Sequence, residues 1–377
     1  MSGNYAYVTL VMHQKHYLYG ALVMGYSLKS TNTKHHVTCM VTDDLYDEFC
    51  DVLLTVFDAV FKVPYINYKC DKLRSRKIEE LYGGWKDVAF TKWNCLSLVK
   101  YEKVCFLDAD LIITQNIDSI FQINAPAGCF HNYWCDFKTD FRSNPTYGSF
   151  LKKMSIYNHA KYGDVVDSSL VQNGLDSGYV IIANCVLLEP CIDIYNNFLN
   201  YMEIKPNYPN CLSMVDEIVI CDFMLKSKKI WHQLECSFNS IPWHMKVTHK
   251  TVINNKIDIS NPKIIHFFNK KKPWITMRGT WYDNEIWWTY YDDMKKNIHN
   301  FNKFNAIMAN LECFNTLKLD DVDQHDYYKK CPYCVFVNFE LMSLRSLNTK
   351  NNKNSFKLIN HDMVKNGKLL CTALCAI

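Results

Sequence analysis

Residues 103–121 read KVCFLDADLIITQNIDSIF, and this stretch decides the fold that the sequence predicts. An apolar run of the kind that forms a buried strand ends in two carboxylates, Asp108 and Asp110, with one alanine between them. In an open parallel sheet, ligands bind at the carboxyl ends of the strands. Two acids so close resist ionising unless a cation lies between them, and oxygen ligands suit Mg²⁺ or Mn²⁺. The pair therefore indicates a metal ion that holds a diphosphate; a solvated turn or helix cap is the alternative.

Strands and helices alternate along the first 121 residues. Apolar runs predict strands at 5–12, 36–42, 58–63 and 103–108, and helical spacing predicts helices at 16–32, 43–57 and 90–102. This alternation predicts an α/β fold with a central, mostly parallel sheet covered on both faces. Further on, we expect strands at 177–188 and 261–268 and helices at 213–227 and 285–298, whereas 131–175 reads as loop.

Composition and length limit the classes of protein. The 377 residues suffice for one large domain or two modest ones, and the formal net charge of +4 comes from basic residues scattered among acids, so nucleic acid is not an expected partner. No run is long enough for a membrane span. The N-terminus shows no signal-peptide pattern, and the 17 cysteines then predict free thiols and a cytoplasmic location.

The last part of the chain differs from the rest. Asparagine and lysine become dense after about residue 300, so we expect a domain at 1–298 and an extension at 299–377. The extension contains Cys331 and Cys334, followed by Cys371 and Cys375. These pairs could hold structural Zn²⁺ if they meet, although reduced cysteines are the preferred interpretation.

Other phosphate chemistries fit less well. The sequence has neither a P-loop motif nor a G-x-G-x-x-G after its first strand. An aspartyl-phosphate hydrolase normally has threonine two residues after its second aspartate, where this chain has Ile112.

Seven motifs in order resemble the retaining glycosyltransferases of family eight, which include glycogenin and galactinol synthase. The resemblance covers about residues 4–295 and is carried by AYVTL with GALVMGYSLK, LTVFDAVFKV, FTKWNCLSLVKYEKVCFLDADLIITQNIDSIF, DSGYVIIANC, VDEIVICDFM, IIHFFNKKKPW and IWWTYYD. It implies a GT-A-like fold, with one Rossmann-type nucleotide-binding domain, and a UDP-sugar donor held by Mn²⁺ or Mg²⁺.

The resemblance also assigns roles residue by residue. Asp108, Asp110 and His266 would be the metal ligands, and Lys272 would neutralise the departing phosphate. Lys92 would reach the donor sugar. The remaining donor-binding positions are Leu10 and Tyr17 at the uridine, Ala109 at the ribose and Asn269 at the diphosphate.

Three positions depart from the family pattern. Asp176 replaces an asparagine, Glu217 a glutamine and Asn269 a glycine. Asp176 and Asp216 are the candidate nucleophiles if retention uses a double displacement, and otherwise they would stabilise the sugar during same-face attack. The departures leave an alternative open, a catalytically weakened relative that binds a nucleotide sugar or a partner protein.

The predicted function is therefore transfer of glucose or galactose from UDP to a hydroxyl of a glycan, polyol or protein. Residues 238–250, where glycogenin carries its acceptor tyrosine, contain no tyrosine, so we expect a separate acceptor. A homodimer is compatible with the sequence.

Overall fold

The protein is described here from a computed structural model. The described residues are 3–70, 83–130, 161–176, 181–204, 215–228, 230–240, 262–268, 272–276, 284–298 and 302–316.

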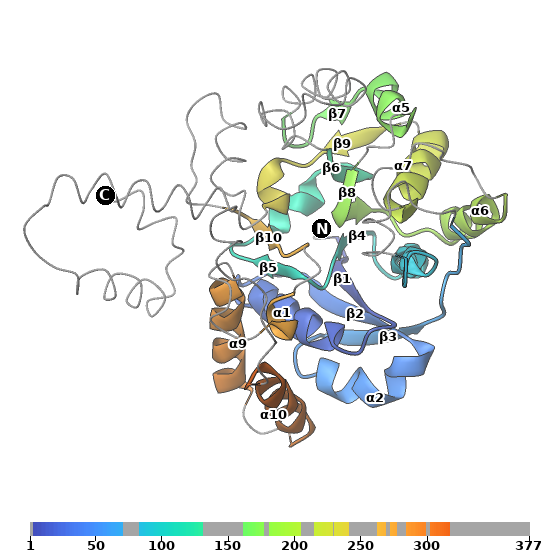
Figure 1. Ribbon diagram of the computed structural model, residues 1–377. Helices are drawn as coiled ribbons and strands as arrows, with labels where there is room; N and C mark the ends of the chain where they lie inside the picture. The colour runs from blue at the N-terminus through green and yellow to red at the C-terminus, as the bar shows by residue number, and fades with distance from the viewer. Residues whose placement is uncertain are drawn as a thin grey trace, which may run out of the picture.

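An eight-stranded sheet of order β3-β2-β1-β4-β8-β6-β9-β7 forms the centre of the molecule (Figure 1). Its strands are β1 (Tyr5–Val11), β2 (His36–Thr42), β3 (Ala59–Val63), β4 (Lys103–Leu107), β6 (Ala127–Phe130), β7 (Val165–Val166), β8 (Ile181–Leu188) and β9 (Trp231–Gln233). Strands β3, β2, β1 and β4 run parallel to one another, whereas β8 is antiparallel to both β4 and β6. This topology confirms the predicted α/β class with a mostly parallel central sheet.

A second, two-stranded sheet extends the edge where β4 ends. Strand β5 (Leu111–Ile113) follows β4 after three residues and pairs antiparallel with β10 (Ile264–His266). The register places His266 opposite Leu111, the residue directly after Asp110. Segments about 150 residues apart in the sequence therefore meet at the carboxyl end of β4.

Alternating side chains of the strands build one core on each face of the sheet. On β1, Tyr7 and Val11 belong to one buried cluster, and Ala6, Val8 and Leu10 to the other. The first core is covered by α1 (Tyr17–Lys29), α2 (Asp43–Leu53), α9 (Glu285–Asn297) and α10 (Asn302–Thr316). The second is covered by α5 (Ser168–Asp176), α6 (Ile192–Glu203), α7 (Val215–Lys228) and the 3₁₀ helix η1 (Ala89–Ser97).

Two local predictions were wrong. The helix expected at 90–102 is the 3₁₀ helix η1, which ends at Ser97 and leaves Val99 57% exposed. Every residue of η1 from Ala89 to Leu96 is buried, so burial does not follow the single apolar face that the sequence predicted. The loop expected at 131–175 contains β7 and most of α5 in its described part.

The first core continues beyond residue 298, the expected domain boundary. Phe304, Met308 and Leu311 of α10 are buried in the same cluster as Trp287 and Tyr291 of α9. The boundary itself stays a prediction, because 317–377, with Cys331, Cys334, Cys371 and Cys375, lies outside the described residues. Within the described part of the chain, no helix combines the length and apolar character needed to cross a membrane.

Candidate metal and donor site

The turn from β4 to β5 presents the two acids. The Asp108 N–H donates to the Asn184 carbonyl of β8 over 2.9 Å, and the Asp110 carbonyl accepts the Phe267 N–H over 2.9 Å. One acid is thus fixed to the central sheet and the other to the segment that follows β10. These backbone bonds bring Asp108, Asp110 and His266 together.

The three side chains can hold a cation. One ligand atom from each lies within 4.8 Å of the other two. Asp110 and His266 are buried, and His266 Nε2 faces Asp110 Oδ1 at 3.5 Å. Among the described residues, no donor hydrogen-bonds to that buried oxygen, which is costly unless a cation compensates it. Two carboxylates and one imidazole are a donor set that suits Mn²⁺, so the residues fit the predicted metal.

Two buried lysines contact the acids. Lys272 Nζ lies 2.5 Å from Asp110 Oδ2 and donates to the Phe267 carbonyl over 2.8 Å. Lys92 Nζ lies 3.3 Å from Asp108 Oδ1 and 3.1 Å from Asp216 Oδ2. The structure thus brings together six of the predicted site residues, namely Lys92, Asp108, Asp110, Asp216, His266 and Lys272.

The two acids of the turn differ in how readily they ionise. Burial alone would raise the pKa of Asp110, but the ammonium of Lys272 outweighs this effect and holds that pKa well below its usual range. Burial raises the pKa of Asp108, and the charge of Asp110 adds to the rise although Lys92 opposes it. Asp110 is therefore the more firmly ionised member of the pair.

Asp216 and Glu217 begin α7 beside this cluster. Asp216 is 1% exposed, and its only ion pair within the described residues is with Lys92. Glu217 Oε1 accepts the Ala183 N–H of β8 over 3.0 Å. Burial, followed by the charge of Asp216, raises the pKa of Glu217 to about 8.

The remaining predicted site residues lie outside the cluster of acids, lysines and histidine. Tyr17 is close to Lys272, whose Nζ lies 6.0 Å from the ring centroid. Leu10 and Ala109 are buried, each in a different core. Asp176 ends α5 with an exposed side chain that accepts a hydrogen bond from Gln172, outside the buried cluster. Asn269 lies outside the described residues.

Sequence reasoning missed two residues that support the site. Asn239 Oδ1 lies 2.8 Å from His266 Nδ1. Gly20 of α1 faces the Ala109 carbonyl, and a Cβ there would lie 2.6 Å from that oxygen. A single asparagine carries no pattern that could have identified it. Gly20 lies in a quoted motif, where its crowding is not visible from the sequence.

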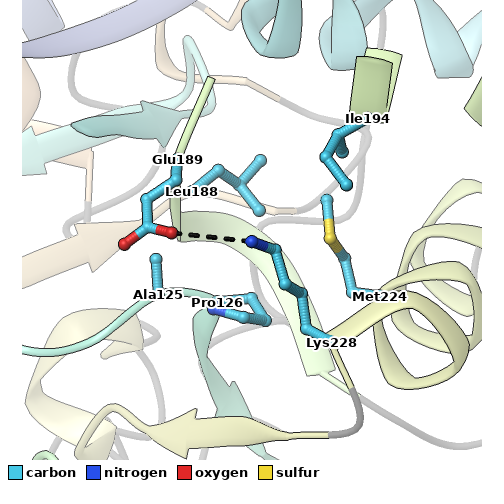
Figure 2. A pocket seen from close by; sticks show the side chains of 7 residues that line it. All are labelled: Ala125, Pro126, Leu188, Glu189, Ile194, Met224 and Lys228. Atoms are coloured by element: carbon cyan, nitrogen blue, oxygen red, sulfur yellow. Dashed lines mark ion pairs between the residues drawn. The ribbon is translucent and has the colours of Figure 1, made fainter. Parts of the chain in front are cut away.

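A shallow pocket lies elsewhere, beside the end of β8 (Figure 2). Lys228 and Glu189 face each other across it, with Nζ 3.8 Å from Oε2, and the ion pair lies between Leu188 on one side and Pro126 on the other (Figure 2). Leu188 pairs with Val104 near the start of β4, whereas the acids follow the end of that strand. The pocket is therefore separate from the candidate site.

Fold and site together define the class of the protein. It is an α/β domain with an Asp-x-Asp turn at the carboxyl end of a central strand, a histidine from a distant segment and two buried lysines. Residues 8–155 match the family described as glycosyl transferase family 8.

Individual relatives extend the comparison. An uncharacterised protein of Acanthamoeba polyphaga mimivirus is 29% identical over 72% of this chain and 83% of its own length. Human glycogenin-1 is 38% identical over 31% of this chain and 32% of its own length, so the chain spans about a third of the glycogenin. The solved galactosyltransferase LgtC, in complex with donor and acceptor sugar analogues, covers 80% of this chain and 99% of its own, with a TM-score of 0.45 and 11% identity.

Proposed function

We propose that the protein is a metal-dependent retaining glycosyltransferase that moves glucose or galactose from UDP to a hydroxyl acceptor. The observation that carries the proposal is the convergence of ligand atoms from Asp108, Asp110 and His266 within 4.8 Å of one another at the carboxyl end of β4. That is where ligands bind in open α/β sheets. The match of residues 8–155 to glycosyl transferase family 8 supports the reaction class.

The three ligands would hold Mn²⁺ or Mg²⁺, which, when bound, neutralises the donor diphosphate and stabilises UDP as a leaving group. Lys272 also stabilises UDP as a leaving group. Its buried ammonium supplies positive charge beside Asp110, and preorganised charge of this kind is usually the largest catalytic contribution. Tyr17, close to Lys272, then marks the side on which the nucleoside lies.

Lys92 and Asp216 bind and orient the donor sugar in this proposal. Lys92 balances the charge of the buried Asp216 across 3.1 Å, and together the two would orient the sugar hydroxyls. In the same-face route, the bond from the anomeric carbon to the UDP oxygen breaks as the acceptor oxygen attacks. The leaving phosphate takes the acceptor proton, and Asp216 orients the sugar. Asp176 stays a candidate for the double-displacement route.

The test is UDP release from UDP-glucose and UDP-galactose with Mn²⁺. Asp110→Asn should lower the rate by about 100-fold or more, because the site loses the carboxylate charge shared by the cation and Lys272. Asn116→Ala, at an exposed asparagine on the turn after β5, is the matched control and should keep the wild-type rate. Turnover equal in wild type and Asp110→Asn would contradict the proposal.

The same assay separates the alternative of a weakened relative. The departures Asp176, Glu217 and Asn269 motivate that alternative. Binding of UDP-sugar with Mn²⁺, but no UDP release by the wild-type protein with any acceptor, would favour it.

We further propose a cytoplasmic location and a separate acceptor molecule. Thiols serve as core residues on adjacent strands, with Cys105 Sγ and Cys185 Sγ 3.7 Å apart in the sheet, which suits a reducing compartment.

A further inference from the structure

We propose that Asn239 is a positioning residue of the metal site, which fixes the tautomer and the ring orientation of His266. The inference rests on the proposed function, because it concerns the same metal. Asn239 precedes Ser240, at the end of the 3₁₀ helix η5 (Cys236–Asn239), and is fully buried.

The contact between the two side chains determines the tautomer. His266 Nδ1 lies 2.8 Å from Asn239 Oδ1. An amide oxygen only accepts hydrogen bonds, so Nδ1 must carry the proton. In the neutral imidazole, the lone pair then resides on Nε2, the nitrogen that faces Asp110 Oδ1 at 3.5 Å. His266 Nε2 and Asp110 Oδ1 then face each other with a lone pair each, and a cation between them would bind both lone pairs.

Backbone pairing keeps Asn239 in register with the histidine. The His266 N–H donates to the Ser240 carbonyl over 2.8 Å, and the Ser240 N–H donates to the Ile264 carbonyl over 2.9 Å. Ser240 thus runs beside β10 like a short parallel strand. The amide of Asn239 cannot leave Nδ1 without breaking this pairing or changing rotamer.

Asn184 of β8 connects the arrangement to the first acid. Its carbonyl accepts the Asp108 N–H over 2.9 Å, and its side-chain amide donates to the Phe238 carbonyl over 3.2 Å. Phe238 directly precedes Asn239. One buried residue therefore sets the distance between the turn that carries Asp108 and the segment that orients His266.

The tautomer can be measured on the metal-free, unmodified chain. Nitrogen NMR of ¹⁵N-histidine-labelled protein, with His266 assigned by its loss in His266→Gln, should show a protonated Nδ1 and a lone pair on Nε2. In Asn239→Leu, which removes the acceptor at similar volume, the preference should be lost. A wild-type His266 protonated on Nε2 would overturn the inference.

Metal affinity provides the second readout. In Mn²⁺ titrations followed by electron paramagnetic resonance, Asn239→Leu should bind about 10- to 100-fold more weakly, the loss typical for partners of metal ligands. Asn239→Asp keeps an acceptor for Nδ1 and should retain near wild-type affinity. This rescue distinguishes positioning of His266 from a general packing role.

Asn94→Leu is the matched control. Asn94 is also buried; its side chain donates to the Pro64 and Thr91 carbonyls and accepts from the Tyr195 hydroxyl, none of them a metal ligand. It should lose stability but keep Mn²⁺ affinity. Equal affinity of wild type and Asn239→Leu would overturn the positioning role alone, whereas a wild type that binds no Mn²⁺ would overturn the proposed metal site.

Discussion

At the scale of single residues, Lys92 joins the two halves of the site. Burial alone would lower the pKa of its ammonium, but Asp108 and Asp216 outweigh this effect and raise that pKa well above its usual range. Lys92 therefore stays charged and links the metal turn to the start of α7. The sequence predicted its role through a motif, and the structure adds that it shares one charge between two acids.

Glu217 illustrates how one residue can depart from a family pattern without changing the charge. Its family counterpart is the neutral glutamine, and the raised pKa of about 8 keeps Glu217 mostly protonated, hence neutral, at pH 7. Like an amide, it also accepts the Ala183 N–H. This departure is therefore compatible with an active enzyme.

The stability of Glu217→Gln should depend on pH in a defined direction. The pKa of Glu217 rises from an ordinary 4.5 to about 8 on folding, so the folded protein binds more protons between these values. Stability from this group thus falls as pH rises from about 4.5 through 8. Glu217→Gln should melt at a higher temperature than wild type at pH 9 and at about the same temperature at pH 4.5. An identical difference at both pH values in thermal unfolding would contradict the raised pKa.

At the scale of elements, the site depends on how closely α1 approaches the β4–β5 turn. A Cβ on Gly20 would lie 2.6 Å from the Ala109 carbonyl oxygen and 2.5 Å from the Trp274 ring. Trp274 follows Lys272 by two residues, and its indole N–H donates to His16 Nδ1 over 2.9 Å. The helix thus contacts both segments that carry the charged residues.

Gly20→Ala should therefore be harmful, although alanine normally favours a helix over glycine. We expect a loss of about 1–3 kcal/mol from overpacking. Mn²⁺ affinity should fall at least about tenfold, because Asp108 and Asp110 flank the displaced carbonyl. Calorimetric titration with Mn²⁺ and urea unfolding measure the two effects.

Gly25→Ala is the control on the same helix. Its Cβ would lie 2.7 Å from the Phe57 ring and 3.0 Å from Val56, neither of which belongs to the β4–β5 turn. It should destabilise the protein without changing Mn²⁺ affinity. Equal affinity losses in both variants would show that α1 has no special role at the site.

Element types were predictable from the sequence where periodicity was long and local, as in the strands β1, β2 and β4 and the helix α7. The 3₁₀ helix η1 was misread because its large apolar residues recur every three positions, a spacing that fits both helix types over a few turns. The pairing of β10 with β5 could be expected only from the motif order, since the two strands lie far apart in the chain. The contact of Asn239 with His266 depends on the pairing of Ser240 with β10 and was not predictable.

At the scale of the whole molecule, two cores on opposite faces of one sheet hold the site in place. The first core joins α1 and α2 to α9 and α10, which come from opposite ends of the described chain (Figure 1). The composition change after residue 300 suggested an appended module, yet burial of Phe304 shows that α10 packs as part of this core.

Phe304→Ala should destabilise the whole domain by about 3–5 kcal/mol. Because α10 shares its core with α1 and α9, unfolding should remain a single transition that moves to lower urea concentration. Ala306→Ser, at an exposed position of α10, should have little effect. A separate early transition in Phe304→Ala, with the main transition unchanged, would show that α10 folds independently.

The central claim is that a divalent cation on Asp108, Asp110 and His266 holds the diphosphate of UDP. Calorimetric titration of UDP into the protein tests it most directly, with Mn²⁺ and with a chelator, in wild type and in Asp110→Asn. The account predicts saturable heat for wild type with Mn²⁺ and a loss of that heat with chelator or in the variant. Equal UDP binding in all conditions, or no UDP heat from wild type with Mn²⁺, would contradict it.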